Sequence, residues 1–235
     1  MNLTSMMVSV AASDGQMPCF LTRPEGGEVL PGVIVVMEAF GLNNHIKDVS
    51  QRVAAEGYSV LAPDLYYREK NSVVGYDNLP DAIRLMTSLT DDGIVKDMNA
   101  AINHLKSQPG VRRDKIGITG FCMGGRITFL MSCKSRDITA AVPFYGGGIG
   151  GLLDQADGIR CPLLLFFGDQ DPFIPNEEVE RITARLKELK KQAEVKVYPG
   201  APHGFFCSER DSYRPDAAKD AWARLLKFFE KHLKG

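Results

Sequence analysis

Cys122 has the sequence surroundings of a catalytic nucleophile. It is the central residue of a G-F-C-M-G motif (120–124), which lies between a short apolar run (116–119) and a stretch of helical character (126–131). A nucleophile at a sharp turn from strand to helix needs glycine two positions to either side, because larger side chains would collide there. The helix that follows would present backbone N–H groups and its positive dipole end to a thiolate. The alternative is a free cysteine packed in the core, where most free cysteines lie.

A thiol nucleophile requires a general base and a group that orients the base. Of the four histidines, His203 follows the last predicted strand in a G-A-P-H-G loop, and such loops often carry functional residues. His104 and His232 fall within predicted helices and His45 lies near the start of another, so we expect solvated positions for these three. We therefore predict that His203 is the general base.

The acid of such a triad is expected between the nucleophile and the histidine along the chain. Asp169 and Asp171 both follow an apolar run at 162–167. We predict Asp171, because Pro172 stiffens the turn after it, whereas Asp169 is expected to accept hydrogen bonds from backbone N–H groups of its loop. The alternative is that both are turn residues without a catalytic role.

Glu38 is unusual because it ends a continuous, largely β-branched apolar stretch. A carboxylate at the end of a buried strand is costly unless it is used. The loop after this strand supplies one half of the oxyanion hole in folds with such a nucleophile turn, so the N–H groups of Ala39 and Met123 are the predicted donors. A plain ion pair with Arg126 or Lys47 is the alternative role for Glu38.

The overall composition is that of an ordinary globular protein. With 235 residues and a net charge of −1, we expect one domain over residues 1–235 and no partnership with nucleic acid or an anionic membrane. No apolar segment approaches the roughly 18 residues that span a bilayer. The five cysteines show no paired spacing, which argues against a disulfide framework or structural zinc and favours a reducing cytoplasm. We expect no metal and no cofactor, a small-molecule substrate, and a monomer or weak homodimer.

Apolar runs alternate with segments of helical periodicity along the chain. Buried strands are predicted at 32–37, 58–61, 116–119, 138–145 and 162–167, and a strand nearer an edge at 194–198. Helical stripes are predicted within 46–53, 79–86, 95–105, 126–131, 179–189 and 222–233. Such alternation predicts an α/β fold with a mostly parallel central sheet and helices on both faces. Two short strands at 7–11 and 17–22 are expected to pair antiparallel at one edge.

Three local details accompany this prediction. Asp91 and Asp92 are expected to cap the helix that follows them, and Asn176 to cap another. The glycine-rich segment 146–151 lacks the strand-to-helix context of a dinucleotide motif and is expected to be a flexible loop. Each candidate catalytic residue follows the end of a predicted strand, which is where ligands bind in such sheets.

Several segments resemble the dienelactone hydrolases, or carboxymethylenebutenolidases, of the α/β-hydrolase superfamily. These segments are E-A-F-G (38–41), P-D-L-Y (63–66), G-F-C-M-G-G (120–125), D-P (171–172) and H-G-F (203–205). The resemblance runs along nearly the whole chain and implies an α/β-hydrolase fold. It also implies cofactor-independent cleavage of a lactone or activated small ester through a cysteine nucleophile and a thioester acyl-enzyme.

The resemblance further implies roles for individual residues. Cys122, Asp171 and His203 would form the catalytic triad, and Glu38 would take the thiol proton when substrate displaces it. Tyr145 falls where the family places a tyrosine near the pocket. The remaining substrate contacts that we expect are Phe40, Tyr66 and Arg126.

One departure from the family pattern concerns the substrate. Founding members hold the substrate carboxylate with two arginines, and one of these positions is Cys207 here. The segment 76–84 offers no convincing match to the other. An anionic dienelactone is therefore a weaker expectation than the hydrolytic chemistry itself.

Three other functions remain open from the sequence. A general carboxylesterase would use cysteine merely in place of serine, and Glu38 would then be dispensable. A degenerate hydrolase acting as a binding module would have no need of the intact Cys122, Asp171 and His203. A redox role would require a partner thiol for Cys122, and Cys207 is the candidate.

Overall fold

The computed structural model describes residues 2–235, and the chain divides into two compact units, 1–118 and 119–235. The strands are β1 (Leu3–Ala12), β2 (Gly15–Pro24), β3 (Leu30–Val36), β4 (Ser59–Pro63), β5 (Val111–Phe121), β6 (Ala140–Phe144), β7 (Leu163–Gly168) and β8 (Ala193–Tyr198). The α-helices are α1 (Asn44–Ala55), α2 (Leu79–Thr87), α3 (Asp91–Ser107), α4 (Met123–Lys134), α5 (Asn176–Glu188) and α6 (Pro215–Phe229). A 3₁₀ helix covers Ile149–Gly158, and a π-helical turn covers Glu230–Lys234.

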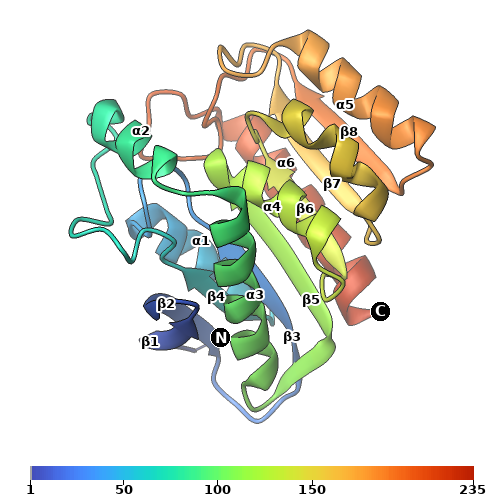
Figure 1. Ribbon diagram of the computed structural model, residues 1–235. Helices are drawn as coiled ribbons and strands as arrows, with labels where there is room; N and C mark the ends of the chain where they lie inside the picture. Colours follow the sequence, from blue (N-terminus) through green and yellow to red (C-terminus); the bar gives the residue numbers. More distant parts are fainter. Residues whose placement is uncertain (1) are drawn as a thin grey trace. The chain divides into compact units, whose positions relative to one another are not determined.

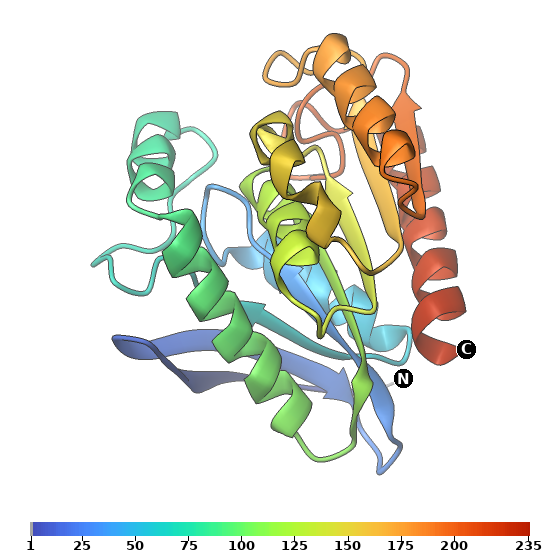
Figure 2. The same cartoon turned by 45° about the vertical axis from the view of Figure 1, so that its right-hand side comes forward.

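The first unit orders its strands β1-β2-β4-β3-β5, and β5 continues into the second unit. β1 pairs antiparallel with β2 and β2 with β4, whereas β3 and β4 are parallel. Figure 1 and Figure 2 show α1 and α3 on opposite faces of these strands. The predicted apolar stripe is buried in α1, with Ile46, Val49 and Val53, whereas in α3 its first residue, Val95, is only half-buried. In α3 the buried apolar side chains include Met98, Ile102 and Leu105.

The second unit orders its strands β5-β6-β7-β8. β6 with β7 and β7 with β8 are parallel pairs. One face of these strands carries α4, the 3₁₀ helix and α5, and the other carries α6 (Figure 1 and Figure 2). The predicted α/β architecture, with a mostly parallel sheet and helices on both faces, is confirmed. A single domain over residues 1–235 stays a prediction.

Two predicted helix caps are wrong. The Thr90 hydroxyl, rather than Asp91 or Asp92, accepts a hydrogen bond from the Gly93 N–H at 3.2 Å. The acids instead occupy the first turn of α3, where negative charge favours the helix dipole. Asn176 is the first residue of α5 and not its cap, because the helix begins directly after Pro175.

The glycine-rich segment also differs from the expectation of a flexible loop. From Ile149 onward the chain forms the 3₁₀ helix Ile149–Gly158. Ile149, Leu152 and Ala156 are buried in it. Burial of these apolar side chains orders a segment whose glycines alone would favour mobility.

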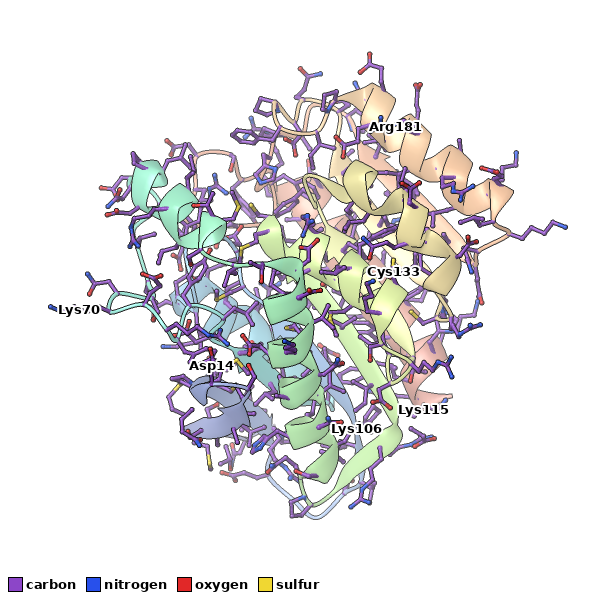
Figure 3. The ribbon with its side chains drawn as sticks, in the orientation of Figure 1. Asp14, Lys70, Lys106, Lys115, Cys133 and Arg181 are labelled. Carbon is purple, nitrogen blue, oxygen red and sulfur yellow. The ribbon has the colours of Figure 1, made fainter. Side chains whose placement is uncertain are left out.

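The connection between β4 and α2 is anchored to several parts of the first unit. The Arg68 guanidinium donates to Asp97 of α3 at 2.7 Å and, through Nε, to Asp14 in the β1–β2 turn at 2.8 Å. Figure 3 shows Asp14 at the end of this hairpin, and Lys70 projecting outward from the connection. The Arg84 side chain of α2 donates to Glu69 at 3.0 Å. These contacts hold an irregular segment whose structure the sequence pattern does not predict.

Gly41 is a position where this connection requires glycine. Its φ is 89°, and a Cβ there would overlap the Ser72 carbonyl. We expect Gly41→Ala to lower the free energy of unfolding by about 1–3 kcal/mol or more. A left-handed backbone is strained for alanine, and the Ser72 carbonyl must also move. The matched control is Gly27→Ala, since a Cβ on Gly27 meets no heavy atom within 4 Å. Urea unfolding checks this expectation, and equal midpoints for the two variants would contradict it.

Candidate active site

Cys122 lies in a strained turn between β5 and α4. Its φ is 56° and its ψ is −117°, a conformation that costs an L-residue about 1–3 kcal/mol and is often found at functional sites. The Cys122 N–H donates to the Phe144 carbonyl at 3.1 Å, and its own carbonyl accepts from the Gly125 N–H at 2.9 Å. The Cys122 side chain is partly exposed, whereas the other four cysteines are buried. The turn therefore presents this sulfur and not the others.

Glycines make the turn possible. A Cβ on Gly120 would overlap the Gly124 carbonyl, which explains the glycine before Cys122. A Cβ on Gly125 would overlap the Phe144 carbonyl at the end of β6. The requirement for glycine at position 125 was not predicted, although the sequence signals it with two consecutive glycines after Met123.

The structure pairs His203 with Asp171. His203 Nδ1 lies 2.7 Å from Asp171 Oδ2, and both side chains are almost fully buried. The other oxygen, Asp171 Oδ1, accepts from the Phe173 N–H at 2.9 Å, so each carboxylate oxygen has its own donor. Asp169 instead accepts from the Gly200 N–H at 2.7 Å, as expected for a loop residue.

The protonation of His203 follows from its neighbours. Burial by itself lowers the pKa of His203, because removal from water disfavours the cation. The hydrogen bond with Asp171, and then the hydrogen bond and charge of Cys122, outweigh this effect and raise the pKa of His203 to about 10. At neutral pH His203 is thus an imidazolium that contacts both Asp171 and Cys122.

Aromatic rings surround His203. The Tyr145 and Phe173 rings each lie 5.1 Å from the imidazole, centroid to centroid, in edge-on arrangements. Tyr145 is fully buried and has a positive φ of 35°, whereas the Phe173 side chain is 61% exposed. An exposed phenylalanine beside this histidine was not predicted, and its only signal is an apolar residue two positions after Asp171.

Glu38 and its loop belong to the first unit. Glu38 is fully buried at the end of β3, and Ala39 and Phe40 are buried beside it. The Tyr66 hydroxyl donates to the Ala39 carbonyl at 3.1 Å, so this fully buried tyrosine supports the loop. The Tyr76 hydroxyl donates to Glu38 Oε2 at 3.0 Å. Tyr76 was not predicted, because no spacing rule connects residues so far apart in the sequence.

Other predicted residues have the following positions. Met123 is the first residue of α4. Arg126 is half-buried, and its backbone N–H donates to the Cys122 carbonyl at 3.2 Å. His45 is buried, so the expectation of a solvated position is wrong. The reason is its register, one helical turn before Val49 on the inner face of α1.

Comparison with known proteins identifies the family. The sequence of residues 17–233 matches the family model of the dienelactone hydrolase family. This chain belongs to the dienelactone hydrolase family. A Salmonella typhimurium relative named as a carboxymethylenebutenolidase is 34% identical over 240 residues, covering 98% of this chain and 88% of its own length. A Bradyrhizobium relative named as a 2-oxo-3-(5-oxofuran-2-ylidene)propanoate lactonase is 33% identical, covering 92% of this chain and 90% of its own length.

A solved structure agrees with the family assignment. The structure of a dienelactone hydrolase homologue from Klebsiella pneumoniae superimposes with a TM-score of 0.91 and 32% identity, covering 98% of this chain and all of that one. The fold is accordingly that of the α/β-hydrolases, and the chain is a hydrolase of the dienelactone hydrolase family. Across residues 2–235 no helix combines the length and apolar character needed to cross a membrane.

The raised pKa of His203 has a measurable consequence. In an NMR titration we expect the His203 imidazole to lose its proton near pH 10, and Asp171→Asn or Cys122→Ala to lower this midpoint by removing a stabilising partner of the cation. His104 is the internal control, because burial lowers its pKa below the ordinary value of 6.5. A wild-type midpoint for His203 at or below 6.5 would contradict the expectation.

The proton held by His203 also makes the free energy of unfolding depend on pH. The folded pKa of His203 lies above its ordinary value of 6.5, so the folded protein holds a proton that the unfolded chain releases. The stabilisation from this group is complete below about pH 6.5 and is lost as the pH rises to about 10.

Proposed function

We propose that this member of the dienelactone hydrolase family cleaves lactones or activated small esters through a thioester on Cys122. The observation that carries the proposal is the chain of contacts from Asp171 through His203 to Cys122, at a strained turn that exposes the sulfur. The names of its relatives, a carboxymethylenebutenolidase and a lactonase, support this class of substrate.

In the first half of the proposed reaction, Cys122 becomes acylated. We assign removal of the thiol proton to Glu38, and the thiolate that forms lies beside the His203 imidazolium, whose pKa its charge helps to raise. The thiolate then attacks the substrate carbonyl, and the N–H groups of Ala39 and Met123 stabilise the oxyanion. The C–O bond breaks, and His203 donates its proton to the leaving oxygen.

In the second half, water hydrolyses the thioester. His203, now neutral and oriented by Asp171, takes a proton from water, and the resulting hydroxide attacks the acyl carbon. The C–S bond breaks, the acid is released, and His203 is again an imidazolium. Glu38 returns its proton to the Cys122 sulfur, so the protons balance over the cycle.

The proposed substrate has a good leaving group and an apolar portion. Thiolate attack favours enol lactones and aryl esters over amides, whose leaving groups are poor. Phe173 offers an exposed apolar surface beside His203. The other proposed substrate contacts are Tyr145, Phe40, Tyr66 and Arg126.

The proposed working form is a monomer or weak homodimer in a reducing cytoplasm. The Cys122 side chain is partly exposed, and a reducing compartment keeps a catalytic thiol available. The proposed partner is a small molecule, with no nucleic acid or membrane.

Removal of the Cys122 sulfur tests the nucleophile. We expect Cys122→Ala to lower turnover of an enol lactone and an aryl ester by at least about 10³-fold, because the covalent step is lost. With a slowly hydrolysed ester, mass spectrometry of the intact wild-type protein should show an acyl adduct that hydroxylamine removes and that the variant lacks.

The control is Cys133→Ala, which removes a buried thiol from α4, the helix that follows Cys122. Undiminished turnover by Cys122→Ala would refute the nucleophile assignment. Full or raised ester hydrolysis by Cys122→Ser would favour a general carboxylesterase. Binding of these compounds without turnover by the wild type would favour a binding module.

Phe173 tests the apolar portion of the substrate. We expect Phe173→Ala to lower kcat/KM by about 10-fold for an aryl-acyl ester and to change it little for the matching acetate, because only the larger acyl group would contact the ring. A panel of esters with and without a carboxylate provides the comparison. An equal change for both esters would show that Phe173 affects the site in another way.

A further inference from the structure

A chain of hydrogen bonds leads from the start of α1 to Glu38. The Asn43 side chain caps α1, and its Oδ1 accepts from the Ile46 N–H at 3.1 Å. The Asn43 Nδ2 donates to the Tyr76 hydroxyl oxygen at 3.0 Å. The Tyr76 hydroxyl donates to Glu38 Oε2, also at 3.0 Å.

The direction of this chain is determined by the helix. A backbone N–H can only donate, so the Asn43 atom that faces Ile46 must be the oxygen. The amide nitrogen therefore faces Tyr76 and donates to it. Since this bond uses a lone pair of the Tyr76 oxygen, the hydroxyl hydrogen is directed to Glu38.

The tyrosine is held in place by its surroundings. The Tyr76 ring packs edge-on against Phe40, with centroids 4.7 Å apart. The Val74 N–H donates to the Phe40 carbonyl at 3.2 Å, which ties the segment before Tyr76 to the loop that follows Glu38. Tyr76 is only half-buried, but these contacts restrict its hydroxyl to a small region.

The consequence concerns the two oxygens of Glu38. A hydrogen bond donated to a carboxylate stabilises the ionised form over the acid. The bond thus holds the Glu38 carboxylate in one orientation, with Oε2 turned toward Tyr76.

We propose that Tyr76, oriented by Asn43, is a positioning residue that holds Glu38 as the base for the Cys122 thiol. This inference rests on the proposed function, in which Glu38 takes that proton. In this proposal Tyr76 acts through Glu38, to which its hydroxyl donates.

The pH profile of Tyr76→Phe is the central test. The variant keeps the ring and removes the hydroxyl, so the Glu38 carboxylate loses the hydrogen bond that orients it. We expect the acidic limb of kcat/KM for an aryl ester, and that of Cys122 alkylation by iodoacetamide, to move up by about one pH unit. The maximal rate above the limb should change much less.

Two variants of Asn43 test the direction of the chain without removing Tyr76. Asn43→Ser and Asn43→Asp both keep a side chain that caps helices well. Neither can donate an amide hydrogen to Tyr76, so its hydroxyl is no longer directed to Glu38 alone. We expect the limb to move in the same direction by a smaller amount, with the urea midpoint close to that of the wild type.

Tyr67→Phe is the matched control, because the Tyr67 hydroxyl also donates to carboxylates, those of Asp14 at 2.7 Å and Asp97 at 3.3 Å. Its profile should match the wild type. If the pH profile of Tyr76→Phe also matches that of the wild type, the proposal is overturned. The proposal is likewise overturned if Glu38→Gln leaves the pH profile of Cys122 alkylation unchanged. Loss of turnover in Cys122→Ala under either result would leave the proposed hydrolase function standing, whereas full activity of that variant would remove the function itself.

Discussion

The candidate site depends on one backbone conformation, the positive φ of Cys122. This conformation turns the chain from β5 into α4 within a single residue and directs the thiol to His203. Strain of about 1–3 kcal/mol persists only where the surroundings over-determine it. Here the Cys122 N–H is bound to the Phe144 carbonyl at 3.1 Å, and glycines 120 and 125 leave no Cβ to oppose the close approach. Packing of the turn against β6 therefore supplies the energy that holds Cys122 in this conformation.

The two buried carboxylates of the candidate site, Asp171 and Glu38, are the second constraint, and each accepts directional hydrogen bonds. Asp171 divides its oxygens between the Phe173 N–H and His203, so the imidazole is oriented by an acid that cannot itself rotate. Glu38 receives the Tyr76 hydroxyl on one oxygen. A buried carboxylate without such donors would be costly. The same hydrogen bonds that make burial tolerable also fix the orientation of each carboxylate, so the stability of each loop and the geometry of the candidate site depend on the same contacts.

Most of the fold could be predicted from the sequence, because strands and helices leave a local periodic pattern. The continuous apolar runs that become β3 and β7 and the stripe of α3 are examples. The errors lie at element ends, where competing local options differ little in energy. Thr90 caps α3 although two acids follow it, and the segment after Gly148 is helical because Ile149 and Leu152 are buried. Burial of this kind depends on distant parts of the chain and leaves no periodic signal.

By itself the sequence determined the family, the sharp turn at Cys122 and the pairing of His203 with Asp171 rather than Asp169, because these follow from motifs and turn chemistry that act over a few residues. The tertiary structure decided the rest. It buries His45, raises the pKa of His203 to about 10 through its neighbours, and brings Tyr76 to a carboxylate on another strand end. Solvent exclusion and hydrogen-bond direction arise only when remote segments meet, so no local pattern encodes them.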